Sequence, residues 1–98
     1  MDNDAKMLQL LGNTLTDLEV KFRATNDFAT QQELEPQIES LITQITALRK
    51  KLREGPVIMT DADIAGMTEI QKQIDAAADK QSMLLAIART AAFIGMRE

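Results

Sequence analysis

One stretch of the chain repeats its apolar residues at alternating spacings of four and three without a miss. The repeat occupies six positions: Leu34, Ile38, Leu41, Ile45, Leu48 and Leu52. Such spacings place side chains on one face of an α-helix, whereas a half-buried strand needs every second residue to be apolar. The stretch therefore predicts a helix with one long apolar stripe, which another helix must cover.

The segment before this repeat carries a matching stripe. Its apolar residues stand at spacings of three and four: Leu8, Leu11, Leu15, Leu18 and Phe22. We predict helices over about residues 4–24 and 30–53. Because a short connection joins two helices of similar length, we expect them to fold back on each other as an antiparallel hairpin.

Local signals mark both ends of the second helix. Thr30 and Glu33 match a capping box, in which each side chain accepts a hydrogen bond from the backbone amide of the other residue. Pro36 is tolerated in a first turn but costs about 3 kcal/mol deeper in a helix. A start near Glu35, or a kink there, is therefore the alternative. Gly55-Pro56 predicts the end of the helix.

The third segment has two possible structures. Thr60 is a candidate N-cap, and the apolar residues from Ile64 to Ile94 keep nearly one helical phase. The polar stretch Asp79–Ser82 contains neither Gly nor Pro. We therefore predict one long helix over about residues 61–96, which makes an all-α, three-helix bundle of a coiled-coil-like hairpin plus a long third helix. In the alternative, Ser82 caps a fourth helix and a four-helix bundle with a break near Asp79–Ser82 results.

A long third helix would extend beyond the hairpin, and the part that extends is the most apolar part of the chain. Soluble monomers avoid leaving such a surface in water. We therefore predict that it binds a second copy or another protein through seven residues: Leu84, Leu85, Ile87, Ala88, Ala91, Phe93 and Ile94. If a fourth helix turns back instead, the extending part disappears.

The composition excludes several chemistries. The chain has no cysteine and no histidine, so it has no thiol nucleophile, no zinc–thiolate site and no imidazole base. Asp61 and Asp63 suit a helix start better than a calcium loop, which needs more ligands and a mid-loop glycine. Glu33, Glu35 and Glu39 flank the apolar stripe as a solvated face. We predict no catalytic residue, metal or cofactor.

A basic cluster offers the alternative function. Arg49, Lys50, Lys51 and Arg53 stand at the end of the second helix and are the candidate phosphate contacts of a small nucleic-acid-associated regulator. Against this, neighbouring residues point about 100° apart around a helix, and cations there also suit its negative C-terminal end. The net charge of −4 argues against broad affinity for nucleic acid or anionic membranes.

Together these features predict a single helical domain over residues 1–98. Its predicted function is that of a non-enzymatic protein–protein interaction module of the adaptor, chaperone or assembly-factor type. Its partner is another copy, as a dimer or higher oligomer, or a different protein. The acidic N-terminus lacks the positive charge of a signal peptide, and the apolar stretch Met83–Met96 is too short to span a membrane. We therefore expect a cytoplasmic protein.

Overall fold

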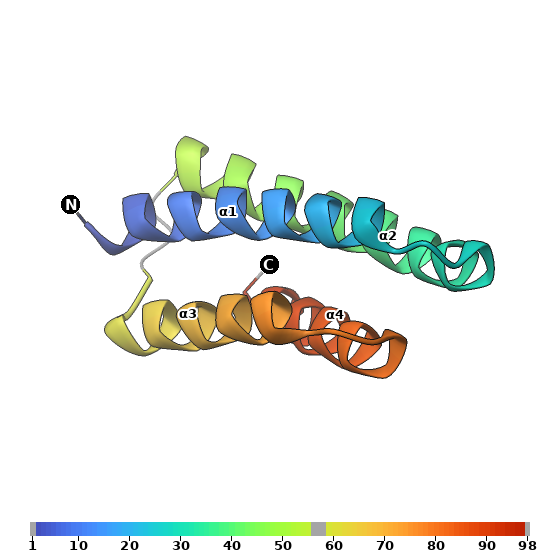
Figure 1. The fold of residues 1–98 in the computed structure, drawn as a ribbon. Helices are drawn as coiled ribbons and strands as arrows, with labels where there is room; N and C mark the ends of the chain where they lie inside the picture. Colours follow the sequence, from blue (N-terminus) through green and yellow to red (C-terminus); the bar gives the residue numbers. More distant parts are fainter. Residues whose placement is uncertain (1, 56–58, 98) are drawn as a thin grey trace.

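The computed structural model describes residues 2–55 and 59–97, which form four helices. These are α1 (Asn3–Ala24), α2 (Phe28–Glu54), α3 (Asp61–Ala76) and α4 (Lys80–Gly95). The hairpin of α1 and α2 forms one layer and the hairpin of α3 and α4 the other (Figure 1). The all-α class and the α1–α2 hairpin are confirmed. The three-helix bundle is wrong, and the four-helix alternative describes the molecule.

The two layers are stacked with their helices in parallel. At one end of the bundle, Asn3 Nδ2 of α1 donates to the Asp61 carboxylate of α3 at 3.0 Å. At the other end, Lys21 Nζ of α1 donates to the Ala77 carbonyl at the end of α3, at 2.9 Å. Thus α1 lies on α3, and α2 likewise lies on α4. Helices α2 and α3 are therefore diagonally opposite in the bundle, and both hairpin turns lie at the same end (Figure 1).

Asp79 caps α4 at the point where the chain turns back between α3 and α4. The Asp79 carboxylate accepts from the Ser82 amide at 2.8 Å, and the Ser82 hydroxyl accepts from the Asp79 amide at 3.3 Å. This capping box satisfies two backbone donors that a helix start otherwise leaves free. Ala77 ends α3 with an extended backbone, so the turn needs no glycine. Ser82 is thus the partner of the cap and not the cap itself.

The start of α2 also differs from the prediction. The helix begins at Phe28, and its N-cap is Asp27, whose carboxylate accepts from the Ala29 amide and the Thr30 hydroxyl. Glu33 does not complete a capping box with Thr30, because Thr30 lies inside the helix. Glu33 instead forms a salt bridge with Lys80 of α4. Pro36 lies in the interior of α2 on an exposed position, and the helix continues through it.

The apolar stripes of the four helices meet in one core. The six stripe residues of α2, from Leu34 to Leu52, are all buried, with at most 7% of any of them exposed. Thr14 of α1 and Thr90 of α4 are buried too, and their hydroxyls donate to the carbonyls four residues earlier at 2.8 and 2.7 Å. Because those donors are satisfied, the threonines fit an otherwise apolar interior. Met59 is also buried in the core, whereas the linker residues 56–58 lie outside the described residues.

The C-terminal end of α4 is fastened to the start of α3. Phe93 lies against Gly66, where a Cβ atom would stand 2.8 Å from the ring. Arg97 lies over this ring, 3.5 Å from its centroid, and forms a salt bridge with Asp63. Hydrogen bonds from the Thr60 backbone and from Arg97 hold the pKa of Asp63 below its usual value. Helix α4 therefore ends against α3 through packing and charge together.

None of the described helices is both long enough and apolar enough to cross a membrane.

The contact between Gly66 and Phe93 provides a test of the fourth helix. We expect Gly66→Ala to lower the free energy of unfolding by about 1 kcal/mol, because an overpacking cost of about 1–3 kcal/mol exceeds the gain of about 1 kcal/mol in helix propensity. In a Phe93→Leu background the same substitution should be neutral or stabilising. Urea unfolding of the four proteins measures this coupling.

The matched control is Gly12→Ala in α1, where a Cβ atom meets only Arg49 at 3.9 Å. This change should stabilise the protein in both backgrounds. An equal effect of Gly66→Ala with Phe93 and with Leu at that position would contradict the α3–α4 hairpin, since a continuous helix would hold the two residues far apart.

Candidate functional site

The seven predicted interface residues differ in burial, according to the side of α4 on which each lies. Ile87 and Ile94 are buried in the core, with 3% and 0% of their surface exposed. Three more pack against the core while partly exposed: Leu84, Ala91 and Phe93. Leu85 and Ala88 point away from the bundle. Because α4 turns back onto α2 and α3, the extending segment on which the interface prediction rested does not exist.

A line of apolar residues nevertheless remains on the outward side of α4, with the exposed cation Arg89 beside it. It consists of Leu85, Ala88, Ala92 and Met96, which we call the α4 outer face. Leu85 is 52% exposed and Met96 84% exposed, and they are two of the four large apolar residues that are exposed among the described residues. The spacings of three and four keep these residues on one side of the helix. The predicted interface included Leu85 and Ala88 but not Ala92 or Met96, although the sequence pairs Ala88 with Ala92 as small residues four positions apart.

The neighbouring side of α3 extends this surface. Its outward residues include three exposed alanines: Ala62, Ala65 and Ala76. A shallow groove of about 200 Å³ separates the two helices, and Ala76, Leu85 and Arg89 are among the residues that line it. The outer side of the α3–α4 layer therefore combines short side chains with the exposed charged residues Glu69, Lys72 and Arg89.

The predicted phosphate contacts are not brought together. Lys50 points outward and lies 4.0 Å from Glu54, one turn later on the same helix. Arg49 is half-buried and lies beside Gly12 of α1. Lys51 and Arg53 are exposed, and their positions on α2 direct them to different sides. The four cations thus surround the end of α2 and do not form one anion site.

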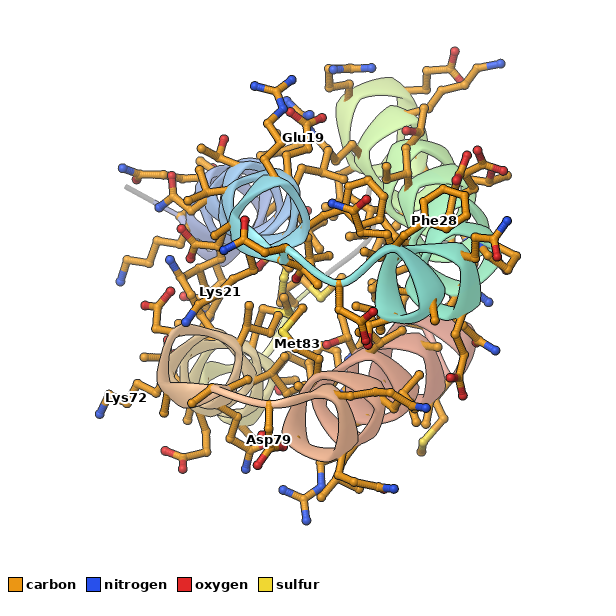
Figure 2. All side chains as sticks on the ribbon, turned by 45° about the vertical axis from the view of Figure 1, so that its right-hand side comes forward. Glu19, Lys21, Phe28, Lys72, Asp79 and Met83 are labelled. Carbon is orange, nitrogen blue, oxygen red and sulfur yellow. The ribbon has the colours of Figure 1, made fainter. Side chains whose placement is uncertain are left out.

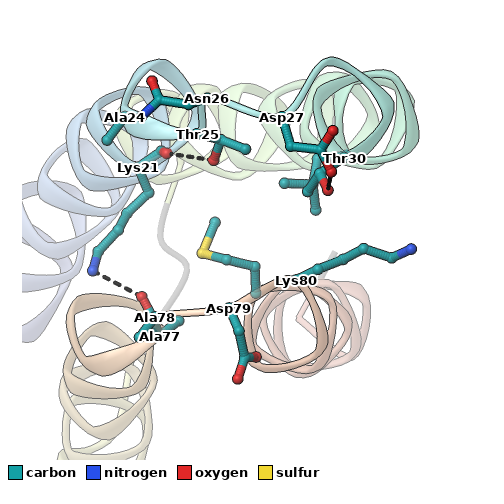
Figure 3. Close-up of a pocket in the computed structure, with 12 residues that line it drawn as sticks. Lys21, Ala24, Thr25, Asn26, Asp27, Thr30, Ala77, Ala78, Asp79 and Lys80 are labelled. Atoms are coloured by element: carbon teal, nitrogen blue, oxygen red, sulfur yellow. Dashed lines mark hydrogen bonds between the residues drawn. The ribbon is translucent and has the colours of Figure 1, made fainter.

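A groove of about 490 Å³ lies between the two hairpin turns (Figure 3). Its polar lining groups hold helix ends. Lys21 Nζ donates to the carbonyls of Asp75 and Ala77, where α3 ends, at 2.8 and 2.9 Å. Asp27 and Asp79 cap α2 and α4, and their hydrogen bonds hold the pKa of each carboxyl below its usual value. Lys21, Asp27 and Asp79 are thus already hydrogen-bonded to the ends of helices, so none of the three is left to bind a ligand in the groove.

One pair of carboxyl groups lies between α1 and α3. Burial, with a hydrogen bond to and repulsion from Asp75, raises the pKa of Asp17 above its ordinary value of 3.8. Gln71 donates to Asp17 at 3.4 Å, and Lys21 opposes the rise. Within the part of the chain that the structure describes, no three carboxylates lie close enough to hold a metal ion. We assign the Asp17–Asp75 pair to helix packing.

This pair predicts a pH-dependent stability. Because the pKa of Asp17 is higher in the folded protein than in the unfolded chain, the ionised carboxyl lowers the free energy of unfolding at pH 7. This destabilisation disappears as the pH falls from above the folded-state pKa to the ordinary value of 3.8. We expect Asp17→Asn to raise the free energy of unfolding at pH 7 by up to about 1 kcal/mol, and to have little effect near pH 3.5. Urea unfolding at several pH values measures the difference.

The control is Glu69→Gln, which removes one charge at an exposed position of α3. Its effect should be small and should not follow the titration of Asp17. A stability gain that is the same at pH 7 and near pH 3.5 would show that the Asp17 carboxyl is not repelled by its neighbour.

No family model matches this chain, and searches of curated proteins and of solved structures also found no match. The function has to be argued from the surfaces of the molecule.

Proposed function

We propose that the protein is a non-enzymatic interaction module that self-associates through the α4 outer face. The observation that supports this is the exposure of Leu85 and Met96 on a helix whose opposite side is already buried. Covering those side chains removes apolar surface from water at about 25 cal/mol per Å². The gain is set against the entropy lost on association.

The pattern of α4 suits pairing with a copy of itself. Ala88 and Ala92 are small, so two copies of the helix can cross closely at this point. When the copies run antiparallel, each Ala88 faces the other copy's Ala92. In the same register each Leu85 lies opposite Gly95 of the other copy, so a large side chain packs against a residue that has no side chain. A two-fold interface uses one patch on both subunits, as this arrangement does.

The outer side of the other layer gives less support for such pairing. Exposed positions on α2 there include Gln32, Glu39, Thr43 and Lys50, which would lose hydration if they were covered. The scattered cations at the end of α2 likewise provide no continuous surface for a phosphate backbone. We therefore place self-association on the α3–α4 layer and prefer it to the nucleic-acid alternative.

Sedimentation velocity at about 10–100 µM protein tests the proposal. We expect the wild-type chain to sediment as a dimer or higher oligomer. Leu85→Glu should weaken association at least about tenfold, because it places a charge inside the contact. Circular dichroism should show that the variant keeps its helices, since Leu85 lies outside the core.

The matched control is Val20→Glu on α1, which introduces the same charge at an apolar residue that is 59% exposed. It should leave the sedimentation unchanged. A compact monomer for the wild-type chain at about 100 µM, or an equal loss of association in both variants, would overturn the proposal.

A further inference from the structure

A second surface lies on the opposite layer, between α1 and α2. It is a groove of about 350 Å³, lined by Glu19, Phe22 and Arg23 from α1 and by Glu35, Ile38, Glu39 and Ile42 from α2. Helices α3 and α4 cover the inner side of this hairpin and leave its outer side open. Figure 2 shows Glu19 on that outer side, away from α3 and α4. We call this surface the α1–α2 groove.

The floor of the α1–α2 groove is apolar. Phe22 and Ile42 pack against the core but stay partly exposed, and Ile38 lies below them with 6% of its surface exposed. Phe28 is 71% exposed in the first turn of α2 (Figure 2) and precedes Glu35 by two helical turns, so it lies on the same side of the helix. The hollow can accept one or two large apolar side chains of a partner.

The rim of the groove is negatively charged. Glu19, Glu35 and Glu39 are all exposed, and none of them forms a salt bridge with another of the described residues. Arg23 supplies one positive charge against these three carboxylates. An apolar floor inside an acidic rim attracts a ligand with the reverse arrangement, which has apolar side chains flanked by cations.

We propose that the α1–α2 groove binds a basic amphipathic helix of a partner protein. One or two apolar side chains of that helix enter the hollow, and lysine or arginine side chains on its flanks pair with Glu19, Glu35 and Glu39. This is the helix-in-groove mode of recognition, in which the apolar contacts supply affinity and the charges supply orientation and specificity.

A second copy of this chain fits the groove less well. On its α4, the exposed Leu85 has the basic neighbour Arg89, while Lys80 pairs with Glu33 and Arg97 with Asp63. Among the described residues, the basic side chains at the end of its α2, such as Lys50 and Arg53, have no exposed large apolar neighbour, because Leu52 is buried. The end of α2 would pair with the carboxylates of the rim but would leave the apolar floor of the groove exposed to water. The groove and the α4 outer face lie on opposite layers, so this inference does not depend on self-association, and both surfaces can be occupied at once.

Fluorescence anisotropy with a defined peptide tests the inference. The probe is an 18-residue, fluorescein-labelled helix with leucine at spacings of three and four and lysine or arginine at the flanking positions. A scrambled peptide of the same composition is the comparison. We expect the amphipathic peptide to bind with a Kd on the order of 10 µM and the scrambled peptide to bind at least about tenfold more weakly, because it cannot form one apolar face.

Two double variants of equal net charge locate the binding site. Glu35→Lys/Glu39→Lys reverses the rim, and we expect it to raise the Kd at least about tenfold. Glu54→Lys/Glu69→Lys reverses two exposed carboxylates elsewhere and should change the Kd less than about threefold. Ile42→Gln alters the half-buried floor and should weaken binding by about three- to tenfold. Circular dichroism of each variant checks that the bundle is folded.

Further measurements separate this inference from the proposed function. Leu85→Glu should leave peptide binding unchanged, whether or not it alters self-association. The inference is overturned if the scrambled peptide binds equally well, or if both double variants lose affinity equally. It is also overturned if Glu35→Lys/Glu39→Lys changes the sedimentation of the protein without peptide, because the occupant would then be a second copy.

Discussion

The burial of the apolar side of α4 against α2 and α3 is the interaction on which the rest of the structure depends. Ile87 and Ile94 enter the core from α4, and burying each such side chain contributes about 1.5–3 kcal/mol. A continuous third helix would leave both in water and would uncover the α4-facing side of α2. The helix break at Ala77–Asp79 gives up a few backbone hydrogen bonds, which the Asp79–Ser82 capping box partly restores.

This closure leaves the molecule with two outer surfaces of different character. The α3–α4 layer presents short side chains, the projecting Leu85 and Met96, and a few charged residues such as Lys72, whereas the α1–α2 layer presents a hollow inside an acidic rim. The first suits close contact between identical helices, and the second suits a basic helix of another protein. A chain that joins copies through one layer and holds a partner on the other would act as an adaptor.

The candidate sites could be predicted from the sequence only in part. The segment that carries the α4 outer face was identified, because Met83–Met96 is apolar on more than one side. Which of its residues are free depends on where α2 and α3 lie, so Ile87 and Leu85 could not be told apart. The α1–α2 groove could not be predicted either, because Glu19 and Glu35 are distant in sequence and only the hairpin brings them to the same rim.

The sequence by itself determined the all-helical class, the α1–α2 hairpin and the buried stripe of α2, because spacings of three and four are a local property of the chain. Tertiary structure decided whether residues 61–96 form one helix or two. The apolar residues keep nearly one phase across the Asp79–Ser82 stretch, so both arrangements satisfy the same local pattern. Only the free energy of packing α4 against α2 and α3 distinguishes them, and that energy belongs to contacts between residues far apart along the chain.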